Sequence, residues 1–105
     1  MELSRDTVTI PESIQGNDNF GLIIRCDSMS PAYSDGDVVF VRKQDTLENS
    51  ECGIFQLGYK RIFKKFYRSE DGKIYLKSLN KNYKDIIVNE DTDSFKIIGK
   101  VYMGR

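Results

Sequence analysis

The sequence of 105 residues contains no histidine, and this absence limits the chemistry that the chain can perform. A Ser-His-Asp triad is impossible, so a serine nucleophile here would need another side chain as its base. Lysine is the plausible substitute, because a neutral amine can accept the proton that an attacking hydroxyl loses. A serine paired with a partly buried lysine is therefore the nucleophilic site that this composition still permits.

Cysteine is also scarce, since Cys26 and Cys52 are the only two in the chain. They are too few and too far apart for the ligand spacing of a metal site, so we expect neither a metal nor another cofactor. A glycine-rich phosphate loop is missing as well. Because no export signal is visible, a reduced pair of thiols is favoured over a disulfide.

Long apolar runs are missing too. No run approaches the roughly 18 residues that cross a bilayer, and the N-terminus lacks the apolar stretch of a signal peptide. The sequence therefore predicts a cytoplasmic protein without membrane contact. The formal net charge is zero, from 16 basic and 16 acidic residues, which argues against a chain that binds nucleic acid as a whole.

What the sequence does contain is a series of short apolar segments separated by turn residues, with almost no helical periodicity. Strands are predicted at residues 7–10, 20–25, 38–41, 52–57, 60–68, 73–79, 85–88 and 95–103. Tight turns are predicted at residues 35–37 and 70–72, and a turn or a single helical turn at residues 28–34. The pattern predicts one mostly β, antiparallel domain over residues 1–105, with residues 1–19 as a partly extended lead-in.

Ser28 is the candidate nucleophile, because it lies just past the apolar run that ends at Ile24, where a buried strand breaks into a turn. It stands in the segment Cys26-Asp27-Ser28-Met29-Ser30-Pro31. Taken alone, a serine after a strand is more often a turn or capping residue than a nucleophile.

Two lysines on the predicted strand 60–68 are candidate bases. Side chains alternate along a strand, so Lys64 shares a face with Ile62 and Phe66, whereas Lys65 shares the other face with apolar neighbours. Burial beside apolar groups favours the neutral form of an amine over the charged form, and a general base must be neutral to accept a proton. Alternation does not choose between the two lysines, and both could instead cover apolar surface with their stems while their amines stay in water.

Five segments in sequence order resemble the C-terminal domain of the LexA/UmuD/phage-repressor family of Ser-Lys self-cleaving proteins. They are Asp27-Ser28-Met29-x-Pro31 after an apolar strand, Asp35-Gly36-Asp37 before Val38 to Val41, Phe63-Lys64-Lys65-Phe66, Leu76-x-Ser78-x-Asn80-x-x-Tyr83, and Ile97-Ile98-Gly99-Lys100-Val101. The similarity runs from about Phe20 to the C-terminus. It implies the small antiparallel β fold of the LexA C-terminal domain.

The resemblance also implies roles for individual residues. Ser28 matches the nucleophile, and Lys64, rather than Lys65, matches the general base. The backbone N–H of Ser28, with a neighbouring turn N–H, would bind the oxyanion, and Met29 would lie beside the cleft or in the core.

Three further residues of the matching segments are expected to be structural. Ser78, Asn80 and Tyr83 would hold a loop through hydrogen bonds from side chains to the backbone. The aspartates of the 35–37 turn are expected to bond the backbone in the same way.

In function, the resemblance implies the C-terminal domain of a LexA-like or phage-repressor-like transcriptional regulator of the SOS response to DNA damage. Such a domain forms homodimers, here expected through the strand at residues 95–103, and cleaves itself within one chain to end repression. A RecA filament is the partner implied as the stimulus. DNA would be contacted only through an N-terminal domain that we expect to be absent from this sequence.

Two departures favour an alternative, which is a proteolytically inactive dimerisation or regulatory module of the same fold. Cys26 stands where the family usually has glycine. The family cleaves at Ala-Gly or Cys-Gly upstream of the nucleophile, but the single alanine, Ala32, follows Ser28. A signal-peptidase-like enzyme also uses a Ser-Lys pair, but the lack of a membrane segment argues against it.

Overall fold

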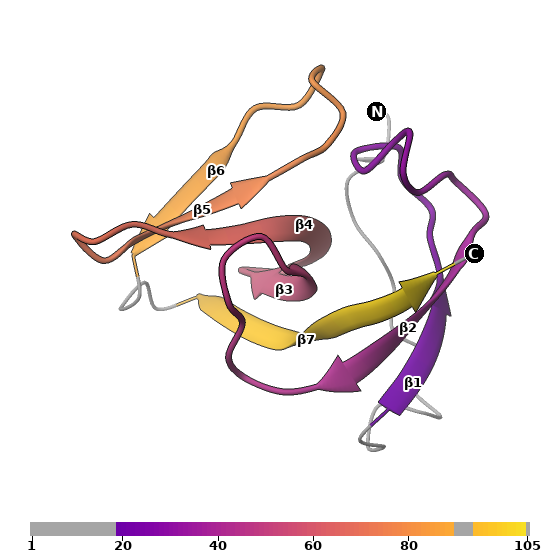
Figure 1. Ribbon diagram of the computed structural model, residues 1–105, viewed down its shortest axis with the longest axis horizontal. Coiled ribbons are helices and arrows are strands. Elements are labelled where there is room, and N and C mark those ends of the chain that lie inside the picture. Colours follow the sequence, from indigo (N-terminus) through magenta and orange to yellow (C-terminus); the bar gives the residue numbers. More distant parts are fainter. Residues whose placement is uncertain (1–18, 90–93, 105) are drawn as a thin grey trace.

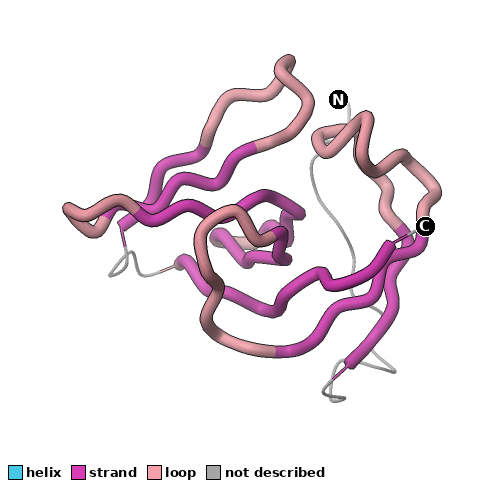
Figure 2. Tube along the Cα trace, in the orientation of Figure 1, coloured by secondary structure: helices cyan, strands magenta, loops and turns pink. Residues whose placement is uncertain are grey.

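The computed structural model describes residues 19–89 and 94–104, and in this part of the chain seven strands form one antiparallel sheet (Figure 1). The strands are β1 (Asn19–Ile23), β2 (Val38–Lys43), β3 (Cys52–Leu57), β4 (Lys60–Arg68), β5 (Lys73–Lys77), β6 (Ile86–Asn89) and β7 (Phe95–Gly104). Their order across the sheet is β1-β2-β7-β3-β4-β5-β6. No residue in the described ranges lies in a helix (Figure 2), so the predicted mostly β fold is confirmed.

The predicted strands agree with the structure most closely where a hairpin joins them. Residues 52–57 and 60–68 form β3 and β4 with the predicted bounds, whereas β5 ends at Lys77, two residues early. The segment at residues 28–34 is a turn with one i to i+4 hydrogen bond, from Tyr33 N to Met29 O at 2.9 Å. The strand predicted at residues 7–10 lies outside the described residues.

The predicted turn at residues 35–37 closes the loop between β1 and β2. Gly36 has a φ of 97°, a backbone conformation that glycine adopts without steric cost. The Ile24 N–H donates to Asp37 O at 2.8 Å, and Asp37 Oδ2 accepts the Ser34 N–H at 2.9 Å. The expectation that an aspartate bonds the backbone here is therefore confirmed for Asp37. These bonds extend the β1–β2 pairing by one residue and fix where the next turn begins.

The sheet is bent rather than flat, and β7 accounts for much of the bend. In its pairing with β3, Ile54 pairs with Gly99 and Phe55 with Ile97, so Ile98 is an extra residue in a β-bulge. A second register shift separates β2 residues Phe40 and Val41 in their pairing with β7. Bulges increase local twist, which curls the two ends of the sheet toward each other (Figure 1).

Two buried clusters fill the curled sheet. The first contains Phe20, Leu22, Ile24, Cys26, Met29, Val39, Val41, Ile54, Phe63 and Val101. The second contains Leu47, Phe55, Ile62, Phe66, Ile74, Leu76 and Val88. The neighbouring β4 residues Ile62 and Phe63 belong to different clusters, so both faces of this strand are buried at its middle. Lys64 follows directly.

The strand predicted at residues 95–103, through which dimerisation was expected, is β7. Residues 95–100 of β7 pair with β3, and residues 99–104 pair with β2, so β7 lies in the interior of the sheet. In the described chain, Gly99 and Lys100 pair with both neighbouring strands, whereas residues 95–97 pair with β3 alone and residues 101, 103 and 104 with β2 alone. The edge strands are β1 and β6.

Candidate functional site

The turn that carries Ser28 begins where β1 stops pairing. Ile24 O accepts the Gly36 N–H at 2.7 Å, and the chain then turns through Asp27, whose carbonyl accepts the Ser30 N–H at 3.2 Å. Ser28 is completely buried, with 0% of its surface exposed. Its hydroxyl lies 3.8 Å from the Cys26 sulfur, a weak hydrogen bond. The candidate nucleophile is therefore held in a closed turn beside the first cluster.

The backbone of the same turn presents two amides. Among the hydrogen bonds of the described residues, none has the Ser28 N–H or the Met29 N–H as its donor. Two adjacent N–H groups without an acceptor suit a developing oxyanion. The side chain of Met29 is 1% exposed and lies in the first cluster with Cys26 and Phe63, so it is a core residue.

Lys64 is also completely buried, at 0% exposure, which is unusual for a lysine. Its Nζ donates a hydrogen bond to Ser78 Oγ at 2.5 Å and lies 5.1 Å from the centre of the Tyr83 ring. Lys65 is only half-buried. The structure therefore separates the two lysines that alternation along the strand could not distinguish.

Lys65 lies beside the second cysteine. Cys52 pairs with Lys65 across β3 and β4. Burial raises the pKa of the Cys52 thiol, and the charge of Lys65 opposes this rise. Burial also raises the pKa of the Tyr33 hydroxyl, and the charge of Cys52 is a smaller cause of the rise. Neither cysteine forms a disulfide among the described residues.

The loop at residues 78–83 binds the serine turn from the opposite side. The Asn80 N–H donates to Ser28 O at 2.9 Å, and Asn80 Nδ2 donates to Asp27 O at 2.9 Å. The Tyr83 hydroxyl hydrogen-bonds the Asp27 carboxylate. In the ribbon, the loops after β1 and after β5 lie side by side at one end of the molecule (Figure 1). These three bonds join segments more than 50 residues apart.

The same loop therefore contacts both candidate catalytic residues. Ser78 and Tyr83 contact the Lys64 amine, and Tyr83 also contacts the turn that holds Ser28. Ser28 and Lys64 share no direct hydrogen bond in this part of the chain. The 78–83 loop is the structural connection between them.

The predicted roles of the loop residues are only partly right. Asn80 bonds the backbone as expected, but Ser78 and Tyr83 bond side chains instead. The Ser78 contact had a signal in the sequence that was missed. A hairpin with its turn at residues 70–72 pairs Lys65 with Lys77. The next positions away from the turn are Lys64 and Ser78, so they lie opposite each other.

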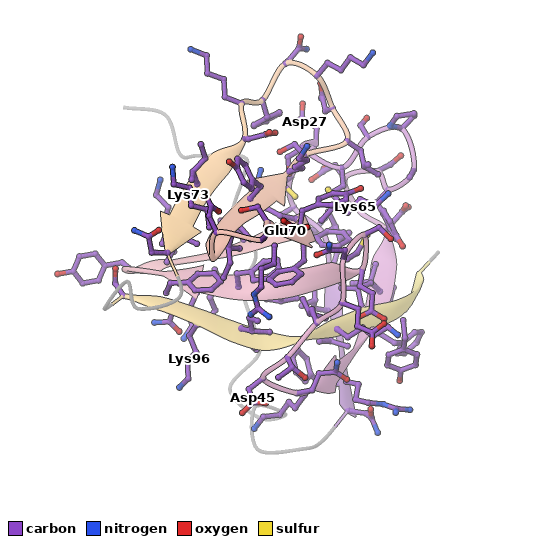
Figure 3. The ribbon with its side chains drawn as sticks, turned by 60° about the vertical axis from the view of Figure 1, so that its left-hand side comes forward. Asp27, Asp45, Lys65, Glu70, Lys73 and Lys96 are labelled. Atoms are coloured by element: carbon purple, nitrogen blue, oxygen red, sulfur yellow. The ribbon has the colours of Figure 1, made fainter. Side chains whose placement is uncertain are left out.

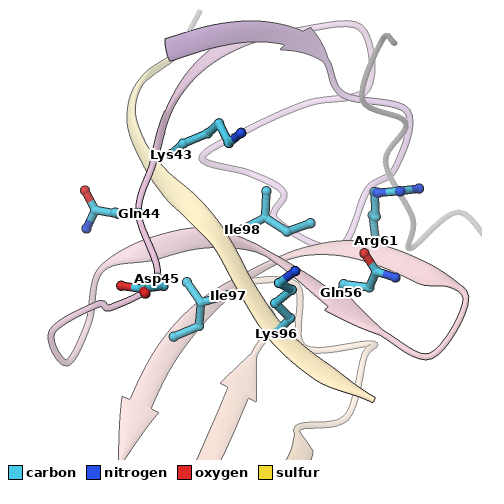
Figure 4. A pocket seen from close by; sticks show the side chains of 8 residues that line it. All are labelled: Lys43, Gln44, Asp45, Gln56, Arg61, Lys96, Ile97 and Ile98. Carbon is cyan, nitrogen blue, oxygen red and sulfur yellow. The ribbon is translucent and has the colours of Figure 1, made fainter. Parts of the chain in front are cut away.

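A separate pocket of about 520 Å³ lies at the other end of the molecule. It is lined by Lys43, Gln44, Asp45, Gln56, Arg61, Lys96, Ile97 and Ile98 (Figure 4). Asp45 and Lys96 lie far from Asp27 in the view with side chains (Figure 3). This pocket therefore does not belong to the serine and lysine site.

The described residues offer little to a metal ion or a membrane. No group of three or more His, Cys, Asp or Glu side chains in these ranges could ligate a metal. In the same ranges, no helix is long and apolar enough to cross a bilayer.

Comparison with known proteins assigns the chain to a family. Residues 1–102 match the family described as Peptidase S24-like. The LexA repressor of Carboxydothermus hydrogenoformans is 36% identical over 104 residues, which are 96% of this chain and 50% of that protein. The LexA repressor of Geobacter metallireducens is 37% identical over 83 residues, or 78% of this chain and 41% of that protein. The LexA repressor of Thermotoga petrophila is 32% identical over 104 residues.

The chain spans about half the length of these curated relatives. The buried serine turn, the buried lysine and the curled antiparallel sheet agree with the sequence match over nearly the whole chain. This chain belongs to the Peptidase S24-like family and has the C-terminal domain type of LexA repressors.

Proposed function

We propose that this chain is the self-cleaving domain of a LexA-like transcriptional repressor, with Ser28 as nucleophile and Lys64 as general base. The observation that carries the proposal is the lysine amine, fully enclosed in the protein and joined through one loop to the turn that holds the serine. Lysines are almost never buried in this way without a specific role.

In the proposed reaction, Ser28 Oγ attacks the carbonyl carbon of the scissile peptide bond while its proton passes to Lys64 Nζ. The carbonyl oxygen becomes an oxyanion and accepts hydrogen bonds from the Ser28 and Met29 N–H groups. The C–N bond then breaks, and the Lys64 ammonium returns its proton to the leaving amine. Water hydrolyses the resulting ester with the neutral lysine again as base.

The resting geometry leaves one step for the substrate to complete. Ser28 Oγ donates a weak hydrogen bond to Cys26 Sγ at 3.8 Å rather than to Lys64. Catalytic hydrogen bonds are often long in enzymes without substrate and shorten when substrate binds. In this proposal, a bound peptide segment displaces the serine hydroxyl from the cysteine toward the amine.

A second candidate function is dimerisation and regulation without proteolysis. The contact between Ser28 and Cys26 favours this second function, because the cysteine sulfur does not act as a base for the serine hydroxyl. In either case the chain would act in the cytoplasm as part of a repressor. The DNA-binding segment would correspond to the half of the relatives that this chain does not match, and a RecA filament would be the stimulus of cleavage in an SOS response.

For homodimer formation we propose the outer face of β1, β2 and β7. Four large apolar side chains are exposed there, Ile23 at 46%, Val38 at 39%, Phe40 at 39% and Tyr102 at 43%. Phe40 and Tyr102 contact each other, with ring centres 6.5 Å apart. Contiguous exposed apolar patches commonly mark protein interfaces. Tyr102 belongs to β7, the strand through which the sequence led us to expect dimerisation, and the proposed face adds β1 and β2 to it.

Light scattering after size-exclusion chromatography tests the dimer. Phe40→Glu places a charge in the centre of the patch and is expected to shift a dimer to a monomer. Tyr59→Glu is the matched control, because Tyr59 is a fully exposed aromatic residue outside the patch and its exposure is 102%. A wild-type monomer, or a dimer that survives Phe40→Glu, contradicts the proposed face.

Peptidase activity is tested by incubating the chain with a polypeptide that carries an Ala-Gly dipeptide, at alkaline pH, followed by mass spectrometry. Ser28→Ala and Lys64→Met are each expected to slow cleavage by roughly 10²–10⁴-fold. Ser30→Ala and Lys65→Met are controls, because these residues share the turn and the strand but are only half-buried. A wild-type chain that cleaves nothing would leave the non-proteolytic function as the better account.

A further inference from the structure

We infer that Ser78 positions the Lys64 amine for catalysis, so that the site is a serine and a lysine held by a second serine. This inference rests on the proposed peptidase function. Its basis is the 2.5 Å hydrogen bond from Lys64 Nζ to Ser78 Oγ. Ser78 does not touch the nucleophile, so its role is to orient the base.

The β4–β5 hairpin places Ser78 where this contact can form. Lys65 pairs with Lys77 at the end of the register, and β5 stops there. Ser78 is therefore opposite Lys64 but already outside the strand, which allows its side chain to turn toward the amine. A residue inside β5 would be held perpendicular to the sheet by the pleat.

An anchor matters for a lysine because its side chain is long. The four methylene groups give it about 2 kcal/mol of rotamer entropy, so an unanchored amine samples several positions. Ser78 Oγ accepts one N–H, and the Tyr83 ring lies against the amine 5.1 Å away. A neutral amine has a lone pair, which is what a general base uses to accept a proton.

The hydrogen bond also suits the charged form. When Lys64 takes the proton from Ser28, the amine becomes an ammonium and still donates to the Ser78 oxygen. Hydrogen bonds from charged groups are about twice as strong as neutral ones. Ser78 therefore stabilises the protonated base more than the resting base, which lowers the barrier of the proton transfer.

The rest of the 78–83 loop fixes the distance between base and nucleophile. Asn80 bonds the carbonyl groups of Asp27 and Ser28, each at 2.9 Å. Ser78, which anchors the lysine, and Asn80, which anchors the serine turn, are separated by the single residue Leu79. The loop thus holds both parts of the site as one unit, which a loop that only closes the fold would not need to do.

The test uses the cleavage assay with the variants Ser78→Ala, Ser78→Cys and Ser78→Thr. Loss of a hydrogen bond to a charged group costs about 1.5–3 kcal/mol, so Ser78→Ala should lower kcat by roughly 10–100-fold. KM should change less than about twofold, because Ser78 does not contact substrate. Ser78→Cys keeps the volume but not the strong acceptor, and should be equally slow. Ser78→Thr restores the hydroxyl and should recover most of kcat.

Ser69→Ala is the matched control. Ser69 is also a hydroxyl bonded to a side chain, that of Asp71, but it lies in the β4–β5 turn away from the site. It should cleave at the wild-type rate. Melting temperatures from circular dichroism separate a loss of fold from a loss of rate, and the isosteric Ser78→Cys should remain folded.

The outcomes distinguish the inference from the proposal on which it rests. Wild-type kcat for Ser78→Ala or Ser78→Cys, with no cleavage by Ser28→Ala and Lys64→Met, overturns the inference alone. A folded but inactive Ser78→Thr also overturns it, because the hydroxyl would then not be what matters. Cleavage by Ser28→Ala at the wild-type rate, or none by the wild type, refutes the peptidase proposal itself.

Discussion

Replacing Lys64 by methionine should make the domain more stable while removing its proposed activity. Lys64 is 0% exposed, so its amine is removed from water when the chain folds. The effective penalty for burying an ion is several kcal/mol, and replacement of buried ions by apolar groups of similar volume is often stabilising. Methionine fits this position because it is unbranched, flexible and close to lysine in length.

The magnitude follows from the contacts that the amine would lose. The amine would lose its hydrogen bond to Ser78, which contributes about 0.5–1.5 kcal/mol for a neutral donor, and its contact with the Tyr83 ring. Two contributions favour the variant. The desolvation penalty of the amine is removed, and each added apolar group contributes about 0.8 kcal/mol to the stability of the fold. Ser78 is half-buried, so its hydroxyl can turn to water after the substitution. The balance is a gain of about 1 kcal/mol.

Thermal unfolding followed by circular dichroism measures this gain. For a domain near this size, about 1 kcal/mol corresponds to an increase of roughly 4–8 °C in Tm. Lys65→Met on the same strand is the control and should change Tm little, because Lys65 is half-buried and its amine can reach water. A fall in Tm for Lys64→Met would show that the buried amine stabilises the fold, and the reasoning from desolvation would be wrong.

Two further predictions concern the sheet and its surface charges. A Cβ on Gly99 would lie 2.5 Å from a backbone carbonyl oxygen of β2, so Gly99→Ala should lose more than about 3 kcal/mol in urea unfolding. Gly36→Ala meets no neighbour but keeps a φ of +97°, so a loss of only about 1 kcal/mol is expected, and equal losses would contradict the packing argument. The hydrogen bond from the Glu48 N–H, and then Lys100, lower the pKa of Glu51 below its usual 4.5. The Glu51 carboxylate therefore stabilises the fold above that pH. This stabilisation is lost as the pH falls through the pKa of the folded state. Glu51→Gln should therefore cost under about 1 kcal/mol at pH 7 and nothing in strong acid, and a cost that persists in acid would contradict this assignment.

The strands could be predicted well because their cause is local. The hairpins of β3 with β4 and of β4 with β5 depend on alternating apolar side chains and on glycines that adopt a positive φ, such as Gly58 at 64° and Gly72 at 89°. The position of β7 could not be predicted in this way. It depends on pairing with strands some 40 to 60 residues earlier, and local patterns carry no information on such partners.

The base was ambiguous in the sequence for a physical reason. Alternation identifies a buried face only if the other face is exposed, but Ile62 and Phe63 are both buried, in different clusters. The resemblance to the family selected Lys64, and the structure places that residue, rather than Lys65, out of solvent. The Ser78 contact, in contrast, could have been derived by extending the hairpin register by one residue.

The cost of the buried lysine also bears on the choice between the two candidate functions. A module that only dimerises needs the outer face of β1, β2 and β7, and nothing in that face depends on an amine enclosed between β4 and the 78–83 loop. Such a module would be more stable with an apolar side chain at position 64, by the balance given above. In such a module, the hydrogen bonds from the 78–83 loop to both the Lys64 side chain and the serine turn would serve no function. Polar groups that reduce stability and are held by several specific contacts are typical of functional sites, so the arrangement around Lys64 and Ser28 favours the peptidase.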